Sequence, residues 1–155
     1  LRTADDVAAC VEGLRDGTID AIATDHAPHA PVDKLCEFDN APSGISGFET
    51  ALPLVLSLVH EKKLDLATLV HRMTAGPVAA LGLERHEGLA GLGSLSVGAP
   101  GDVLVFDPNA EWTVDPEQFA SKGWNTPLAG RVLKGQVVAT VHHGHVVHSA
   151  DGVKV

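Results

Sequence analysis

Three polar side chains suited to metal or anion binding lie close together in the sequence: Asp25, His26 and His29. They follow a short, mostly apolar run, Ile19 to Thr24, which is typical of a buried strand. Because Pro28 prevents a regular helix here, we expect the three side chains on a stiff turn. A carboxylate and two imidazoles on one rigid turn suit the binding of a metal ion or an anion.

The same spacing allows a simpler interpretation. Asp25 could cap a turn, and His26 and His29 could be ordinary surface histidines, since Asp-His pairs are common in loops. From spacing alone, both interpretations stay open.

Other chemically capable residues fit structural roles better. His142, His143 and His145 contain an H-x-H pattern, but they surround Gly144, where we expect an exposed hairpin turn that binds metal only adventitiously. Cys36 has no adjacent basic residue that would activate it as a nucleophile. None of these residues is predicted to take part in catalysis.

A helix and a buried strand are predicted before the polar turn. Thr3 can cap a helix that ends at Gly17, and the apolar run of residues 19–24 follows it. A helix that feeds a buried strand indicates an α/β fold. In an α/β barrel the catalytic side chains project from the carboxyl ends of the strands, which is where Asp25 lies.

A long loop and three helices are predicted after the turn. Residues 25–44 lack apolar periodicity, and a loop of that length is usually functional or disordered. Ser46 to Glu49 has the spacing of a capping box, which explains Glu49 and starts a helix through Val59. Asp65 can cap a helix through Met73, and Thr74 can cap a short helix that ends near Gly82.

The pattern changes near residue 88 from helices to short strands separated by turns. We predict antiparallel strands at residues 94–97, 102–106, 131–133 and 137–147. The sequence therefore predicts two domains, residues 1–87 and residues 88–155.

Composition excludes several classes of function. The chain has 11 Lys and Arg against 20 Asp and Glu, and this net charge of −9 disfavours nucleic acids and anionic membranes as partners. No apolar run approaches the roughly 20 residues that cross a bilayer, and two cysteines make no disulfide framework. We therefore expect a cytoplasmic protein. Because the chain opens with Leu1 and not Met, we consider a cleaved, split or truncated parent.

Two motifs at a characteristic separation resemble the closing signature of bacterial-type dihydroorotases in the amidohydrolase superfamily. They read TDHAPH at residues 24–29 and APSGISGFETALPL at residues 41–54. The tail is also similar to these enzymes, in the glycine-rich passage of residues 91–106 and in SKGWNTP at residues 121–127. The resemblance covers essentially the whole chain.

The resemblance implies a reversible reaction that interconverts dihydroorotate and N-carbamoyl-aspartate in pyrimidine synthesis, with one or two Zn²⁺ ions per complete active site. It implies that Asp25 ligates a metal and moves the proton between the attacking water and the ring nitrogen. His29 would hold the substrate carboxylate, and the backbone of Ser43 and Gly44 would meet the substrate ring. For His26, support of the site and a plain hydrogen-bonding turn role both stay open.

The resemblance further implies that the chain is the C-terminal part of a TIM (β/α)8 barrel, with its last strand and helices, plus most of a small antiparallel β-sandwich domain. The other metal ligands and a substrate arginine cannot be found in residues 1–24. We therefore expect the N-terminal portion of the same enzyme as a partner, and a homo-oligomer when the enzyme is complete.

Two other functions are considered. One is a related cyclic-amide hydrolase of the allantoinase or hydantoinase type. The other is a non-catalytic dihydroorotase-like subunit that scaffolds aspartate transcarbamoylase; such subunits tend to have lost catalytic residues, whereas Asp25 and His29 are present here.

Overall fold

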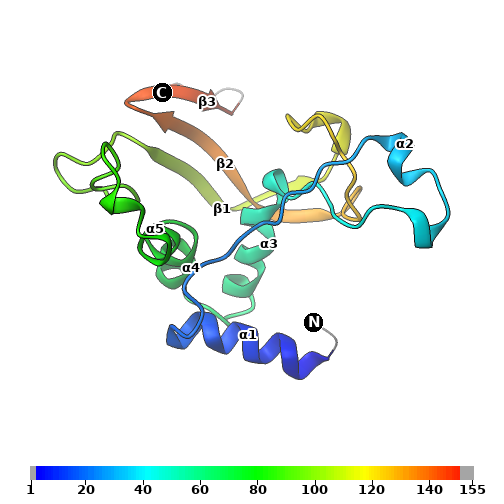
Figure 1. Ribbon diagram of the computed structural model, residues 1–155, viewed down its shortest axis with the longest axis horizontal. Helices are drawn as coiled ribbons and strands as arrows, with labels where there is room; N and C mark the ends of the chain where they lie inside the picture. The colour runs from blue at the N-terminus through cyan, green and yellow to red at the C-terminus, as the bar shows by residue number, and fades with distance from the viewer. Residues whose placement is uncertain (1–2, 151–155) are drawn as a thin grey trace. The chain divides into compact units, whose positions relative to one another are not determined.

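A computed structural model describes residues 3–150, which form a mixed α/β structure with a three-stranded sheet in the order β1-β2-β3 (Figure 1). The helices and strands are α1 (Ala4–Asp16), α2 (Pro31–Lys34), η1 (Phe38–Asn40), α3 (Phe48–His60), α4 (Leu66–Met73), α5 (Ala75–Leu81), η2 (Leu83–Arg85), β1 (Val103–Thr113), η3 (Pro116–Gln118), β2 (Val132–His142) and β3 (His145–Ser149).

The chain divides into two compact units that are each described by themselves. The first unit comprises Leu1–Ile22, Leu56–Asp107 and Val137–Val155, and the second comprises Ala23–Val55 and Pro108–Gln136. The units are defined by contacts within the chain, whereas the predicted domains, residues 1–87 and 88–155, are defined by the change from helices to strands. The domain boundaries therefore stay a prediction.

Helices α1, α4 and α5 form the helical part of the first unit (Figure 1). Helix α1 has the predicted ends, because Thr3 and Asp6 form a reciprocal capping box and Gly17 closes the helix with a left-handed backbone. Helix α4 packs against both α1 and α5, and the Arg72 guanidinium donates to the Leu14 carbonyl at 2.9 Å. The side chains buried in this unit are Leu14, Leu56, Leu64, Leu69 and Ala139.

The helix ends after residue 60 are also largely as predicted. Asp65 caps α4 by accepting the Thr68 N–H at 2.9 Å. Thr74 lies at the start of α5 but does not cap it with its side chain, since its hydroxyl donates to the Val70 carbonyl at 2.7 Å. The predicted cap at Thr74 is therefore wrong.

The predicted strand at residues 19–24 is not a strand in the described structure. The segment is extended, and the Ile22 N–H donates to the Arg72 carbonyl, which belongs to a helix. Gly76 lies so close to this segment that an added Cβ would come within 2.3 Å of the Asp20 carbonyl oxygen. A strand needs neighbouring strands to satisfy its backbone, and among residues 3–150 none flanks this segment.

The strands beyond residue 88 differ from their predicted positions. Residues 94–97 form a turn, because the Ser94 hydroxyl accepts the Ser96 N–H and donates to the Ser96 hydroxyl. Strand β1 continues past Phe106, the predicted end of this strand, to Thr113. Two strands were predicted at residues 131–133 and 137–147, and this region instead forms β2 from Val132 to His142 and β3 from His145 to Ser149.

Strands β2 and β3 form the predicted hairpin around Gly144. They pair antiparallel, and both His143 and Gly144 have positive φ, as the tight turn requires. The Asp102 carboxylate accepts the His143 N–H at 2.8 Å and contacts His142 Nδ1 at 2.9 Å. The histidines here are exposed, which confirms the predicted exposed turn.

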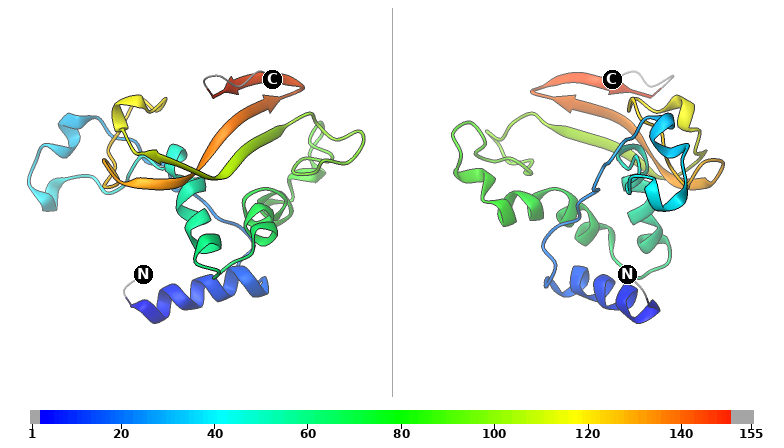
Figure 2. Two further views of the ribbon diagram at one scale, coloured as in Figure 1. Left: turned by 180° about the vertical axis from the view of Figure 1, so that it is seen from behind. Right: turned by 45° about the vertical axis from the view of Figure 1, so that its right-hand side comes forward.

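The second unit carries the polar turn and the long loop after it. The loop is ordered around α2 and η1, which Figure 2 shows as the blue-to-cyan segment that leads into α3. Val114 and Leu128 are buried in the second unit, and the Val114 N–H donates to the Arg131 carbonyl at 2.9 Å, which closes the 114–131 loop. Two short helices therefore replace the irregular loop that the sequence predicts.

Large apolar side chains stay exposed in the described structure. Phe38 is 94% exposed, Leu35 is 82% exposed and Val97 is fully exposed. Within residues 3–150 no helix is both long and apolar enough to cross a membrane.

Candidate active site

The polar turn is fastened to the segment that precedes α3. His26 forms an isolated parallel bridge with Ile45, and the Ala27 N–H donates to the Ile45 carbonyl at 2.8 Å. One residue earlier, Asp25 has a left-handed backbone with φ of 46°, and its side chain is exposed. Asp tolerates this conformation better than most residues, so the turn can present the carboxylate without a glycine.

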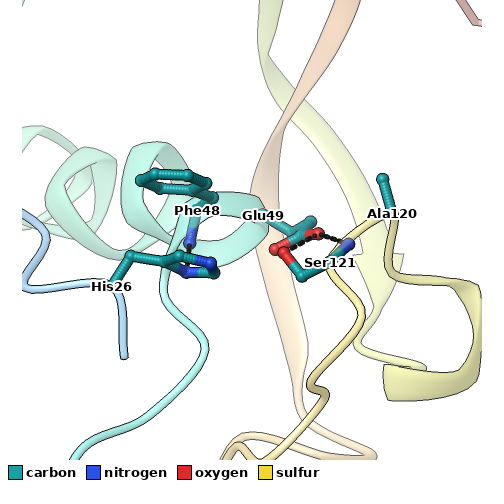
Figure 3. Close-up of a pocket in the computed structure, with 5 residues that line it drawn as sticks. All are labelled: His26, Phe48, Glu49, Ala120 and Ser121. Atoms are coloured by element: carbon teal, nitrogen blue, oxygen red, sulfur yellow. Dashed lines mark hydrogen bonds between the residues drawn. The ribbon is translucent and has the colours of Figure 1, made fainter. Parts of the chain in front are cut away.

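The His26 ring serves the beginning of α3 (Figure 3). Its Nδ1 accepts the N–H groups of Gly47 and Phe48 at 3.0 and 3.3 Å, so in the neutral ring the proton lies on Nε2. The ring also stacks on Phe48, with centroids 3.8 Å apart and planes 7° apart. His26 therefore acts as a hydrogen-bonding residue that holds the turn to the helix.

The predicted capping box at residues 46–49 is wrong, because both side chains have other partners. The Ser46 hydroxyl donates to the Gly123 carbonyl at 2.5 Å, and the Ser46 N–H donates to the Asn125 carbonyl at 2.8 Å. The Glu49 carboxylate accepts the N–H and the hydroxyl of Ser121 at 3.0 and 2.8 Å. The helix start that Ser46 and Glu49 were expected to cap is instead satisfied by His26.

Glu49 lines a shallow hollow together with His26, Phe48, Ala120 and Ser121 (Figure 3). Burial raises the pKa of its carboxyl, but the backbone and hydroxyl hydrogen bonds from Ser121 outweigh this, so the net pKa lies below the ordinary value of 4.5. Its Oε2 atom is buried and has no hydrogen-bond partner among the described residues. Glu49 is thus a charged anchor for the Ser121 loop.

Three of the four predicted site residues lie together. His29 Nε2 lies 3.1 Å from the Ser43 carbonyl oxygen, which can only accept, so Nε2 carries the proton. Gly44 has φ of +119°, and a Cβ added there would come within 2.5 Å of the Ala27 Cβ and 3.4 Å of His29 Nε2. A side chain at position 44 would therefore collide with the turn, which explains the glycine.

Side chains of the second unit hold three consecutive carbonyls in this loop. Lys34 Nζ donates to the Pro42 carbonyl and to the Gly44 carbonyl, the latter at 3.0 Å, and His29 holds the Ser43 carbonyl between them. In a trans peptide the N–H points opposite to the carbonyl, and no described peptide is cis. The Ser43 N–H consequently faces away from Lys34 and the Gly44 N–H faces away from the His29 ring, and no described residue accepts either group.

Asn125 and Gly123 were not predicted as site residues, although both lie in the SKGWNTP segment that resembles dihydroorotases. The Asn125 side chain accepts the His29 N–H at 2.7 Å and donates to the Gly44 carbonyl at 2.9 Å. Gly123 is buried and lies against Pro28 and His29. The glycine of this segment, two residues before the asparagine, was the signal for a close backbone approach.

Asp25 is the only one of the predicted residues available to a metal as a charged ligand. Its side chain is exposed, and an exposed carboxylate oxygen is a suitable ligand for zinc. Within residues 3–150 no three His, Cys, Asp or Glu side chains gather in a way that could hold a metal ion. The Asp25 carboxylate therefore has the chemistry of a metal ligand, and the described residues alone do not complete a metal site.

Residues 2–148 match the amidohydrolase family. This chain belongs to the amidohydrolase family. The fold agrees, because the chain superposes on an L-hydantoinase from Arthrobacter aurescens with a TM-score of 0.83 and 31% identity. That match covers 99% of this amidohydrolase chain and 34% of the hydantoinase.

Relatives of this amidohydrolase include dihydroorotases. The enzyme from Geotalea daltonii is 52% identical over 151 residues, and the enzyme from Anaeromyxobacter dehalogenans is 52% identical over 148 residues. These matches cover 97% and 96% of this chain but only 34% and 33% of the relatives, so the chain spans about a third of their length. The resemblance to dihydroorotases that the motifs indicate is confirmed.

Proposed function

We propose that this chain is the closing third of a dihydroorotase, the enzyme that reversibly hydrolyses dihydroorotate to N-carbamoyl-aspartate. The observation that carries the proposal is the 52% identity to dihydroorotases over nearly the whole chain, compared with 31% to the L-hydantoinase structure. The arrangement of His29, Ser43 and Gly44 within one hydrogen-bonded loop supports it.

Asp25 would supply the acid–base step. Zinc, when bound, lowers the pKa of water from about 16 toward 7 and polarises the amide carbonyl. As water adds to the carbonyl carbon, the Asp25 carboxylate takes its proton and then delivers that proton to the ring nitrogen as the C–N bond breaks. The left-handed backbone and exposed side chain at Asp25 suit a group that must reach both atoms.

His29 and the loop of Ser43 and Gly44 would bind the substrate. The His29 Nε2–H now donates to a peptide carbonyl, and a carboxylate is a stronger acceptor that can compete for it. The Ser43 N–H faces away from Lys34, the Gly44 N–H faces away from the His29 ring, and both are available to the carbonyl groups of a cyclic amide. The loop thus offers donors for an anionic ring substrate.

The whole enzyme that we propose has a TIM (β/α)8 barrel, to which residues 1–87 contribute the last strand, the catalytic loop and helices. Residues 88–155 would form most of a small β-sandwich domain. Residues 19–24, extended but without flanking strands, and the exposed Leu35 and Phe38 support a missing N-terminal portion as the main partner.

That portion would also carry the remaining ligands for one or two Zn²⁺ ions, and the complete enzyme would be a cytoplasmic homo-oligomer. An isolated chain of residues 1–155 should therefore not show a sharp, monomeric two-state unfolding transition; a cooperative transition in the isolated chain would contradict this part of the proposal.

One alternative has a specific observation in its favour. The structural match to L-hydantoinase allows a related cyclic-amide hydrolase. Assays of the complete enzyme with dihydroorotate, hydantoin and allantoin distinguish them: turnover of dihydroorotate well above the other two supports the proposal, and a preference for hydantoin or allantoin overturns it. A complete protein that lacks H-x-H in its first barrel strand, and that shows no turnover when zinc is supplied, would favour the aspartate transcarbamoylase scaffold.

A further inference from the structure

Asn125 holds two separate parts of the proposed substrate loop with one side chain. Its Oδ1 accepts the His29 N–H at 2.7 Å, and its Nδ2 donates to the Gly44 carbonyl at 2.9 Å. The two contacts fix the orientation of the amide, because an N–H needs the oxygen and a carbonyl needs the NH₂ group. The side chain therefore spans from the backbone of the turn to the backbone of the loop.

The backbone on either side of Asn125 is fastened to the same region. The Asn125 carbonyl accepts the Ser46 N–H at 2.8 Å, and the Gly123 carbonyl accepts the Ser46 hydroxyl at 2.5 Å. A Cβ added to Gly123 would lie 2.7 Å from the Pro28 Cβ and 2.9 Å from the His29 N atom. Residues 123–125 thus lie directly against the turn, which leaves the Asn125 amide little freedom to move.

We propose that Asn125 is a positioning residue, which sets the spacing between His29 and the Ser43–Gly44 backbone. This inference rests on the proposed function, in which His29 holds the substrate carboxylate and Ser43 and Gly44 meet the ring. Asn125 itself faces peptide groups, and so it acts through these residues and does not touch the substrate.

Loss of the Asn125 amide should weaken substrate binding more than chemistry. His29 and the loop contact parts of the substrate that do not change bonding, so their misplacement removes binding that the ground state and the transition state share. The acid–base step belongs to Asp25, which lies outside the Asn125 contacts. The expected signature is a raised KM with kcat nearly unchanged.

The test uses the full-length enzyme that contains this chain, with zinc, and compares Asn125→Ala, Asn125→Asp and the control Asn40→Ala. Asn40 is an exposed asparagine of the second unit whose amide contacts Glu37. For Asn125→Ala we expect a KM for dihydroorotate raised about tenfold with kcat within about threefold, and faster hydrogen exchange of the peptide that contains His29. Asn40→Ala should match the wild type in all three quantities.

Asn125→Asp keeps the shape of the side chain and the acceptor for the His29 N–H but loses the donor to Gly44. It should preserve the exchange protection of His29 and still raise KM, and it decides the question if Asn125→Ala does not fold. A KM within twofold of the wild type in a folded variant overturns the inference. A kcat that falls about tenfold while KM is unchanged also overturns it. If the wild type does not hydrolyse dihydroorotate, the proposed function fails, and hydrogen exchange of the His29 peptide then tests the positioning role by itself. Faster exchange in Asn125→Ala supports positioning, and unchanged exchange overturns it.

Discussion

Replacing His26 with Ala tests whether this ring holds the start of α3. The change removes an acceptor for two N–H groups, at 3.0 and 3.3 Å, and a ring stacked at 3.8 Å on Phe48. A lost helix cap costs about 1 kcal/mol. The stacking contributes about 0.5–1 kcal/mol, at the lower end of its range because Phe48 is 65% exposed. The local opening of the helix start should therefore become about 1.5–2 kcal/mol easier.

The assay is hydrogen exchange of the Gly47 and Phe48 amides in the full-length enzyme. We expect exchange about 10- to 30-fold faster in His26→Ala, since 1.4 kcal/mol corresponds to a factor of ten. His26→Asn places an oxygen near the position of Nδ1 and removes only the stacking, so exchange should rise by about two- to fivefold. His86→Ala, at an exposed position of the other unit, is the control. Equal exchange in His26→Ala and the control would refute the capping role.

Two further perturbations test the contacts around the turn. The folded pKa of Glu49 lies below 4.5, so its contribution to stability is complete above that pH and is lost as the pH falls through the lowered value. Glu49→Gln should therefore lose less thermal stability on acidification than the exposed control Glu117→Gln. Parallel curves of thermal midpoint against pH for the two variants would contradict this. Gly123→Ala places a methyl group 2.8 Å from the His29 carbonyl oxygen, so we expect the free energy of unfolding to fall by about 1–3 kcal/mol. Denaturant unfolding measures this loss, with Ala129→Ser as the control. A loss no larger than that of the control would show that the turn can shift to accommodate the methyl group.

Local signals in the sequence predict the helices well. Thr3 and Gly17 mark the ends of α1, Asp65 marks the start of α4, and the Gly144 hairpin lies where its turn residues indicate. Each of these features depends on residues a few positions apart, so sequence spacing is enough to find them. The grouping of His29 with Ser43 and Gly44 came from the resemblance and not from spacing.

The errors arise where distant residues compete for the same groups. Ser46 and Glu49 have the spacing of a capping box, but Gly123, Asn125 and Ser121 satisfy them from more than 70 positions away. Strand 19–24 has the composition of a buried strand, yet a strand also needs partners, and residues 3–150 provide none. Tertiary contacts of this kind leave no local pattern, and so Asn125 was missed as well.

The role of Asp25 in dihydroorotate hydrolysis is tested by measuring turnover in the zinc-loaded, full-length enzyme and in its Asp25→Asn variant, with Asp39→Asn as an exposed carboxylate control. We expect dihydroorotate hydrolysis in the wild type and in Asp39→Asn, and a kcat about 10²- to 10⁴-fold lower in Asp25→Asn with its thermal midpoint retained. Near-normal turnover in a folded Asp25→Asn enzyme would contradict the assignment of Asp25 as the acid–base residue.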